Sequence, residues 1–290
     1  MTSFAEALES GRFLVTAELT PPKGTDLSDL LRKAEALRGW VDAFNLTDSA
    51  SAVMTMAPIG AAHAVKRLGL EPILQVTGRD RNRIALQADL LAASALGVST
   101  VLCMSGDPPG AGDHPEAKGV FDLDVTSLLR AVVALDAGKD MMGNALKGAA
   151  PLCPGAVVNP GADDVDRELR RMEEKVASGA RFFQTQAVYE PAPFRAFMAR
   201  AKAFGVPVLA GFIVLKSGDM ARRLNATLPG VSVPEGLVAE LDGAEDRAAK
   251  SVEIAGRIIG ELRDVCQGVH IMAIGWEARI PAILQAAAIR

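Results

Sequence analysis

The chain has 290 residues, 49% of them hydrophobic, and its 31 basic and 35 acidic side chains give a net charge of −4. That length allows one large α/β domain or two smaller ones. The absence of a basic block argues against nucleic-acid binding, no apolar run is long enough to span a bilayer, and residues 1–12 lack the pattern of a signal peptide.

The cysteines and histidines argue against a disulfide framework or a structural metal. The three cysteines are widely spaced and form no CxxC pair, and an odd number does not fit a disulfide-linked fold. The three histidines are also scattered. We therefore expect a cytoplasmic protein of a reducing compartment, without a metal.

Strand-like and helix-like runs alternate along the chain. The first strand is predicted over 13–19, and Pro21 and Pro22 end it because proline cannot donate to a sheet ladder. Further strands are predicted over 41–47, 71–77, 100–104, within 151–158, and over 181–186, 206–213 and 269–273. Helices are predicted over 27–37, 58–68, 82–96, 125–135, 165–178, 194–204, 218–228, 234–241, 245–265 and 280–288.

The spacing of the strand ends indicates the fold. Five of the seven intervals between successive ends lie between 27 and 30 residues, the length of one βα unit, and the two longer intervals contain no convincing extra strand. Eight strands, each followed by helix, favour a single-domain (βα)8 TIM barrel over residues 1–290. An open doubly wound sheet is the alternative, but no strand is followed by a GxGxxG motif.

In a barrel, the carboxyl ends of the strands and the loops after them form the active site. Each of the polar residues there could have a structural role only. Thr47 and Asp48 could cap the next segment, and Asn159 could belong to an ordinary turn. Ten polar residues at equivalent strand ends favour a functional cluster. They are Glu18, Thr47, Asp48, Gln75, Thr77, Ser105, Asp107, Asn159, Thr185 and Gln186.

The residue types of this cluster indicate its chemistry. Glu18 and Asp107 suit proton donation and electrostatic tuning. The amides suit a flat heterocycle with mixed donor and acceptor edges. No histidine or cysteine stands at a predicted strand end, which disfavours a Cys–His or Ser–His nucleophile and a zinc site. Lys175, on the helix before the sixth strand, is read as a solvated charge that could instead reach a phosphate.

Several motifs together resemble those of the methylenetetrahydrofolate reductases. They occur in the family's order along nearly the whole chain. The motifs are AELTPPKG around Glu18, LTDSA around Thr47, SGDPPG around Asp107, GNALKGAAPLCPGAVVNP ending near Asn159, KVASGARFFQTQAVYE around Gln186, and VHIMAIGWE near the end. The resemblance implies a (βα)8 barrel that binds a flavin, usually FAD, and acts in one-carbon metabolism and methionine biosynthesis.

The resemblance also implies roles for single residues. Glu18 matches the general acid that helps open 5,10-methylenetetrahydrofolate to an iminium, which accepts hydride and becomes 5-methyltetrahydrofolate. Asp107 matches an aspartate that lies beside the flavin and the folate. Gln186 matches a glutamine that binds the pterin. The positions matching flavin contacts are Thr47, Gln75, Ser105, Gly106, Asp107, Asn159, Glu168 and Lys175. NAD(P)H would supply the hydride, and the flavin would carry it.

The chain also departs from the family pattern. Ser105 stands where well-known bacterial members carry arginine, Gln75 where they carry histidine, and aromatic residues make up only 4% of the chain. FMN, loosely bound FAD or no tightly bound flavin are therefore alternatives. The ending VHIMAIGWE resembles short reductases that work with partner proteins. A partner redox protein could thus replace NAD(P)H, and the net direction could be oxidation.

Two other functions stay open at this point. A pterin-binding barrel methyltransferase would share the amide-rich pocket without redox chemistry. A non-catalytic folate-binding subunit would not need both Glu18 and Asp107. We expect a homo-oligomer, although the apolar helix face that includes Ile259 and Leu262 is explained first by packing on the barrel.

Overall fold

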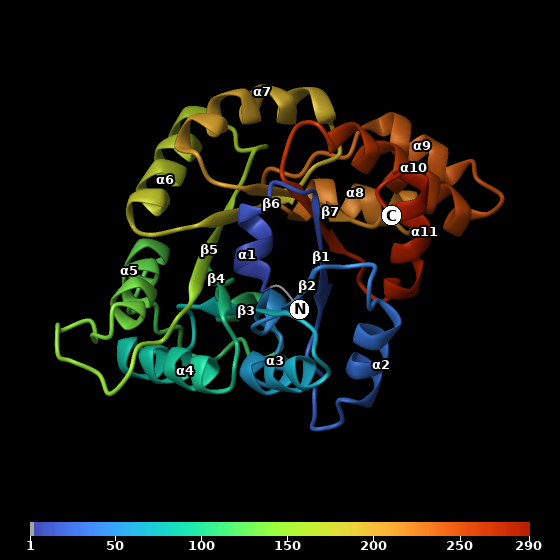
Figure 1. The fold of residues 1–290 in the computed structure, drawn as a ribbon. Helices are drawn as coiled ribbons and strands as arrows, with labels where there is room; N and C mark the ends of the chain where they lie inside the picture. Colours follow the sequence, from blue (N-terminus) through green and yellow to red (C-terminus); the bar gives the residue numbers. More distant parts are fainter. Residues whose placement is uncertain (1–2) are drawn as a thin grey trace.

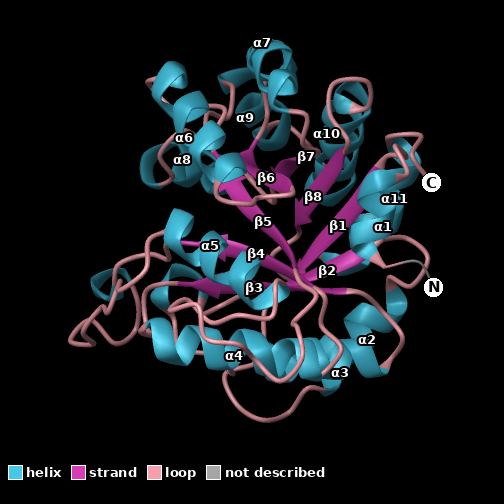
Figure 2. Cartoon of the chain, turned by 60° about the vertical axis from the view of Figure 1, so that its left-hand side comes forward, coloured by secondary structure: helices cyan, strands magenta, loops and turns pink. Residues whose placement is uncertain are grey.

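The computed structural model describes residues 3–290, and its eight strands form a closed parallel barrel in sequence order (Figures 1 and 2). The (βα)8 barrel predicted from the strand spacing is confirmed. The strands are β1 Leu14–Leu19, β2 Ala43–Leu46, β3 Pro72–Thr77, β4 Thr100–Met104, β5 Cys153–Val158, β6 Phe182–Ala187, β7 Val208–Ile213 and β8 Gly268–Met272. Closure pairs β8 with β1, with His270 beside Thr16.

Helices surround the barrel, as Figure 2 shows. They are α2 Ser28–Ala36, α3 Pro58–Arg67, α4 Arg83–Ala95, α5 Val125–Asp136, α6 Val165–Ala177, α7 Pro191–Ala201, α8 Gly218–Thr227, α9 Glu235–Asp242, α10 Arg247–Leu262 and α11 Ile280–Ala286. Short 3-10 turns follow β2, β4, α7 and β8: η1 Ala50–Ala52, η2 Pro109–Ala111, η3 Lys202–Phe204 and η4 Glu277–Arg279. Among residues 3–290, no helix has the length and apolar character that a membrane crossing needs.

Three helical details differ from the sequence prediction. Helix α10 ends at Leu262, three residues before the predicted end. Helix α7 begins at Pro191, three residues before the predicted start, because proline suits the first helical turn. A short helix that was not predicted, α1 (Phe4–Glu9), precedes β1. Ser3 and Glu6 form a reciprocal capping box that holds its first turn. Six residues are too few to give a clear helical period.

Helix α1 packs against the amino-terminal end of the barrel, and in Figure 1 it lies inside the ring of outer helices. Its Phe4 is fully buried and meets Phe182 edge-on, with the ring centroids 5.6 Å apart. The lowest inward-facing layer of the barrel joins this cluster: Leu14, Ala43, Ile73, Leu102, Cys153, Phe182 and Leu209. This end of the barrel is therefore an apolar core.

Gly155 makes room for the largest side chain of that layer. It pairs with Phe182 on the neighbouring strand, and a Cβ at Gly155 would collide with the Phe182 ring. A glycine on β5 thus allows an aromatic residue to fill the barrel interior without a void, as a close-packed core requires.

Phe4→Ala should lower the free energy of unfolding by about 3 kcal/mol, since it removes a buried aromatic side chain and leaves a cavity. Ile84→Ala, at a side chain 75% exposed on α4, should change it by less than about 0.5 kcal/mol. Urea unfolding followed by circular dichroism measures both. Equal effects of the two substitutions would contradict the role of α1 as part of the core.

Candidate active site

A cavity of about 580 Å³ opens at the carboxyl end of the barrel. Its volume is typical of small-molecule sites. Nine of the ten residues that the resemblance assigns to catalysis or cofactor binding line it: Glu18, Gln75, Ser105, Gly106, Asp107, Asn159, Glu168, Lys175 and Gln186. The tenth, Thr47, is buried after β2 and does not line the cavity, and its hydroxyl has no hydrogen-bond partner among residues 3–290.

Glu18 points into this cavity from β1, with 23% of its side chain exposed. Two side chains approach its Oε2 atom. The Gln75 amide nitrogen lies 3.5 Å away, and the His270 Nε2 atom lies 3.9 Å away. A carboxyl group in this position is accessible to a ligand and close to two groups that can donate to it.

Beneath Glu18 the barrel interior is polar. Asn45 and Gln184 exchange two amide hydrogen bonds of 2.7 and 3.1 Å across the barrel. Gln184 also donates to the Thr16 hydroxyl at 3.2 Å, and this hydroxyl lies 3.0 Å from His270 Nδ1. All four side chains are buried, so each polar group needs a partner inside the protein.

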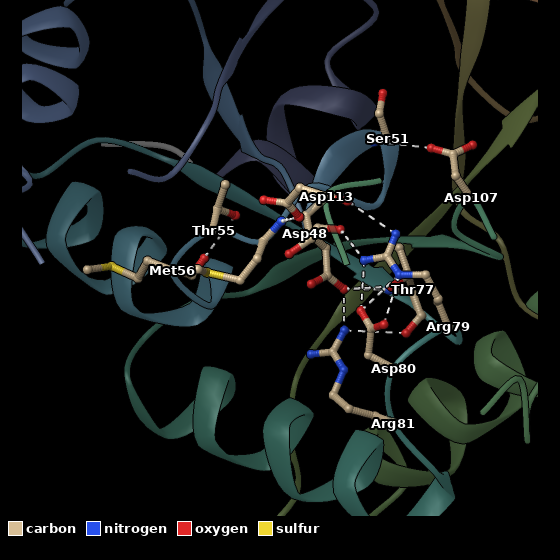
Figure 3. Close-up of polar contacts among 12 residues, drawn as sticks. Asp48, Ser51, Thr55, Met56, Thr77, Arg79, Asp80, Arg81, Asp107 and Asp113 are labelled. Atoms are coloured by element: carbon tan, nitrogen blue, oxygen red, sulfur yellow. Dashed lines mark hydrogen bonds and ion pairs between the residues drawn. The ribbon is translucent and has the colours of Figure 1, made fainter. Parts of the chain in front are cut away.

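The rim above β2 and β3 is held by charged groups (Figure 3). The Asp48 carboxylate accepts hydrogen bonds from the Thr77 backbone and hydroxyl at 2.8 and 3.0 Å, and it pairs with Arg81. Arg79 is 2% exposed and donates to the backbone carbonyls of Asp48 and Ser49. The hydrogen bonds to the Asp80 carboxylate raise the pKa of Arg79, so this buried side chain stays charged.

Three loops are tied together over the same side of the cavity. The Ser51 amide donates to Asp107 at 3.1 Å, which links the loops after β2 and β4 (Figure 3). Met54 donates to Asp113 at 2.9 Å, and Lys23 from the loop after β1 pairs with the same carboxylate. The Lys23 ammonium holds the pKa of Asp113 well below its usual range. The position of Asp107 is therefore set by the β2 loop.

The backbone of these loops has an unusual conformation. Ser49, Ser51 and Ala52 have φ angles of 49°, 54° and 56°. These angles lie in the left-handed region of the backbone, which residues other than glycine rarely adopt. Gly106 also has a positive φ, of 85°, and a Cβ there would lie 3.0 Å from Arg79 and Thr77 side-chain atoms. Glycine is thus required where the β4 loop crosses the charged rim.

Helix α6 closes the opposite side. Lys175 donates to the Val157 carbonyl at 2.7 Å, and burial lowers the pKa of Lys175. Glu168 accepts from the Asn159 backbone at 2.9 Å, while the Asn159 amide reaches Pro229 O at 3.2 Å. Lys175 thus faces the cavity rather than solvent, whereas the Asn159 side chain connects two loops.

The sequence did not identify several residues of the site. His270 was passed over because it lies in the middle of β8, yet it lines the cavity. Alternation along the strand could have revealed it, since His270 and Met272 share one face. Arg79 and Arg171 also line the cavity but were not singled out, because charged loop and helix residues are usually solvated.

The family profile of methylenetetrahydrofolate reductase matches residues 3–288. The chain belongs to the methylenetetrahydrofolate reductase family. The resemblance noted from the motifs is therefore confirmed. Methylenetetrahydrofolate reductase 2 of Schizosaccharomyces pombe is 24% identical over 73% of this chain, which spans about a third, 35%, of that relative's length. The 5,10-methylenetetrahydrofolate reductase of Pectobacterium carotovorum is also 24% identical, over 81% of this chain and 75% of its own length.

A solved structure has the same fold along the whole chain. It is an uncharacterized protein from Clostridium thermocellum that binds two copies of 5-methyl-5,6,7,8-tetrahydrofolic acid. The TM-score is 0.69 at 18% identity, over 99% of each chain. At 18% identity, this similarity shows only that the two proteins share a fold.

Asp48→Asn should destabilise the rim of the site. It removes the charge that accepts hydrogen bonds from Thr77 and pairs with Arg81, and losing hydrogen bonds to a charged group costs about 2 kcal/mol. Asp29→Asn, at a carboxylate 62% exposed and paired with Arg32, should cost less than about 1 kcal/mol. Thermal unfolding of both variants measures the difference, and equal melting temperatures would refute this account of the rim.

Proposed function

We propose that this protein interconverts 5,10-methylenetetrahydrofolate and 5-methyltetrahydrofolate, with reducing equivalents from NAD(P)H. Membership of the methylenetetrahydrofolate reductase family supports the proposal. The observation that carries it is Glu18, a carboxyl group in the mouth of the barrel with the Gln75 amide and His270 within 4 Å of one oxygen. A folate-binding neighbour of the same fold agrees with such a pocket.

In this proposal Glu18 acts as the general acid. The methylene carbon of the substrate bridges two nitrogens and accepts hydride poorly. When the Glu18 proton goes to the leaving ring nitrogen, the carbon–nitrogen bond breaks and the carbon becomes part of an iminium ion. A hydride then completes the methyl group, NAD(P)H is oxidised, and Glu18 takes up a proton before the next turnover.

Other side chains would orient the ligands. The Gln186 amide, on β6, lines the cavity and offers both a donor and an acceptor to the pterin edge. Asp107 is fixed by the Ser51 amide at the opposite rim, where its charge would bear on ligands beside Glu18. We assign to Gln186 recognition of the substrate and to Asp107 electrostatic tuning.

The lining residues fit a flavin, and we propose FAD. Gln75 and Thr77 supply amide and hydroxyl groups on β3, and the cations Lys175 and Arg171 lie on the α6 side, where a phosphate would need them. When bound, the flavin supplies hydride chemistry between NAD(P)H and the methylene carbon.

Glu18→Gln should reduce turnover of methylenetetrahydrofolate at least about 100-fold, because general acid catalysis contributes that much or more. Its control, Glu253→Gln, changes a carboxylate 57% exposed on α10 and should leave the rate unchanged. The assay follows NADH oxidation and methyltetrahydrofolate formation. Full activity in Glu18→Gln would exclude Glu18 as the general acid and leave methyl transfer or plain folate binding to test.

Lys175→Met should weaken binding of FAD about tenfold or more, the effect of losing one hydrogen bond to a charged group. Lys250→Met, on the outer helix α10, is the matched control. Quenching of flavin fluorescence measures affinity for FAD and FMN separately. An unchanged affinity for both flavins would refute the role of Lys175. Reduction of the bound flavin by NADH, or only by another donor, identifies the source of electrons.

A further inference from the structure

The polar layer below Glu18 has one titratable member, His270. Of the two strands that flank β8, β7 carries no titratable side chain and β1 carries only Glu18. The other groups around the ring are neutral: Thr16 on Nδ1, and the Gln184 and Asn45 amides beyond it. Gln75, which approaches the same Glu18 oxygen, is also neutral. Buried His270 therefore has one charged neighbour on these strands.

The hydrogen bonds are compatible with one tautomer of the ring in particular. The Gln184 amide nitrogen donates to the Thr16 hydroxyl oxygen, which leaves the hydroxyl proton available for His270 Nδ1 at 3.0 Å. We infer that Nδ1 accepts this proton, so that the ring proton of a neutral imidazole lies on Nε2. Nε2 is the atom that faces Glu18, at 3.9 Å.

We propose that His270 is a positioning residue for Glu18, whose Nε2–H donates to the Glu18 carboxylate after the proton has been delivered to the substrate. The separation is about 1 Å longer than a hydrogen bond, and a rotation of the partly buried Glu18 side chain would close it. The amide pair and Thr16 hold the ring in the donating tautomer. This inference rests on the proposed function for its role in turnover, but not for its geometry.

Two substitutions test the contacts of the two ring nitrogens of His270 separately. His270→Gln keeps an amide nitrogen at the position of Nε2, toward Glu18. His270→Asn keeps a polar atom at the position of Nδ1, toward Thr16, and loses the group that faces Glu18. Both retain a polar side chain in the buried layer. His63→Gln, on the outer helix α3, is the control for a histidine substitution elsewhere.

The first measurement is the pH dependence of reductase turnover. Glu18 acts in its protonated form, so activity falls as Glu18 ionises, and a donor that stabilises the carboxylate brings this fall to lower pH. In His270→Asn the alkaline limb should move up by about one pH unit, the effect of losing one hydrogen bond to a charged group. His270→Gln and His63→Gln should keep the wild-type limb. If His270→Asn instead lowers the rate equally at every pH, without moving the alkaline limb, His270 has a structural role only and the inference is wrong.

The second measurement needs no turnover. Long-range proton–nitrogen NMR spectra of protein labelled with ¹⁵N-histidine distinguish a protonated from a bare ring nitrogen, and His270→Gln assigns the signal. We expect protonated Nε2 and bare Nδ1 at His270, with Nε2 responding to Glu18→Gln and Nδ1 to Thr16→Val. A proton on Nδ1, or no response to Glu18→Gln, would overturn the inference. Absence of reductase activity in the wild type would count against the proposed function alone.

Discussion

The alternation of inward- and outward-facing side chains along the strands of the closed barrel is the constraint on which the rest of this structure depends. Every second side chain of a strand points inward, so neighbouring strands in register build layers across one interior. The two layers below Glu18 are buried, so their side chains must satisfy one another. The lowest layer does so with apolar contacts around Phe182 and α1. The next does so with hydrogen bonds among Thr16, Asn45, Gln184 and His270.

This division separates stability from chemistry along the barrel axis. The apolar end excludes water and stabilises the closed sheet. The polar layer costs free energy unless every group is paired, and the reciprocal Asn45–Gln184 amides meet that condition. In return it fixes the orientation of groups directly below the cavity. Glu18 is one layer higher, where it can be reached from solvent and from a ligand.

The same requirement shapes the loops. Arg79 can be buried because two backbone carbonyls and Asp80 accept its hydrogen bonds. Its side chain lines the cavity and passes beside Gly106, while the guanidinium binds the carbonyls of the β2 loop. The loop after β3 thus supplies a buried cation that connects it to the loop after β2. The left-handed residues of the β2 loop are held by contacts to Asp107 and Asp113.

The sequence by itself determined the repeating architecture. Within residues 3–290, all eight strands and ten of the eleven α-helices follow from local apolar periodicity and turn residues, which act over a few neighbours and can be read along the chain. It also determined that polar residues gather at the strand ends, and nine of the ten residues singled out for the site line one cavity. Helix α1 was missed because six residues carry too little periodicity.

Only the tertiary structure decided which of these groups meet. The pairs Asn45–Gln184 and Thr16–His270 join residues 139 and 254 positions apart, a relation that the closure and register of the barrel create. Burial of Arg79 likewise depends on carbonyl groups of another loop. Hydrogen-bond partners across a barrel are set by three-dimensional register rather than by local sequence. The immediate surroundings of Glu18, and the position of His270 beneath it, were therefore visible only in the folded molecule.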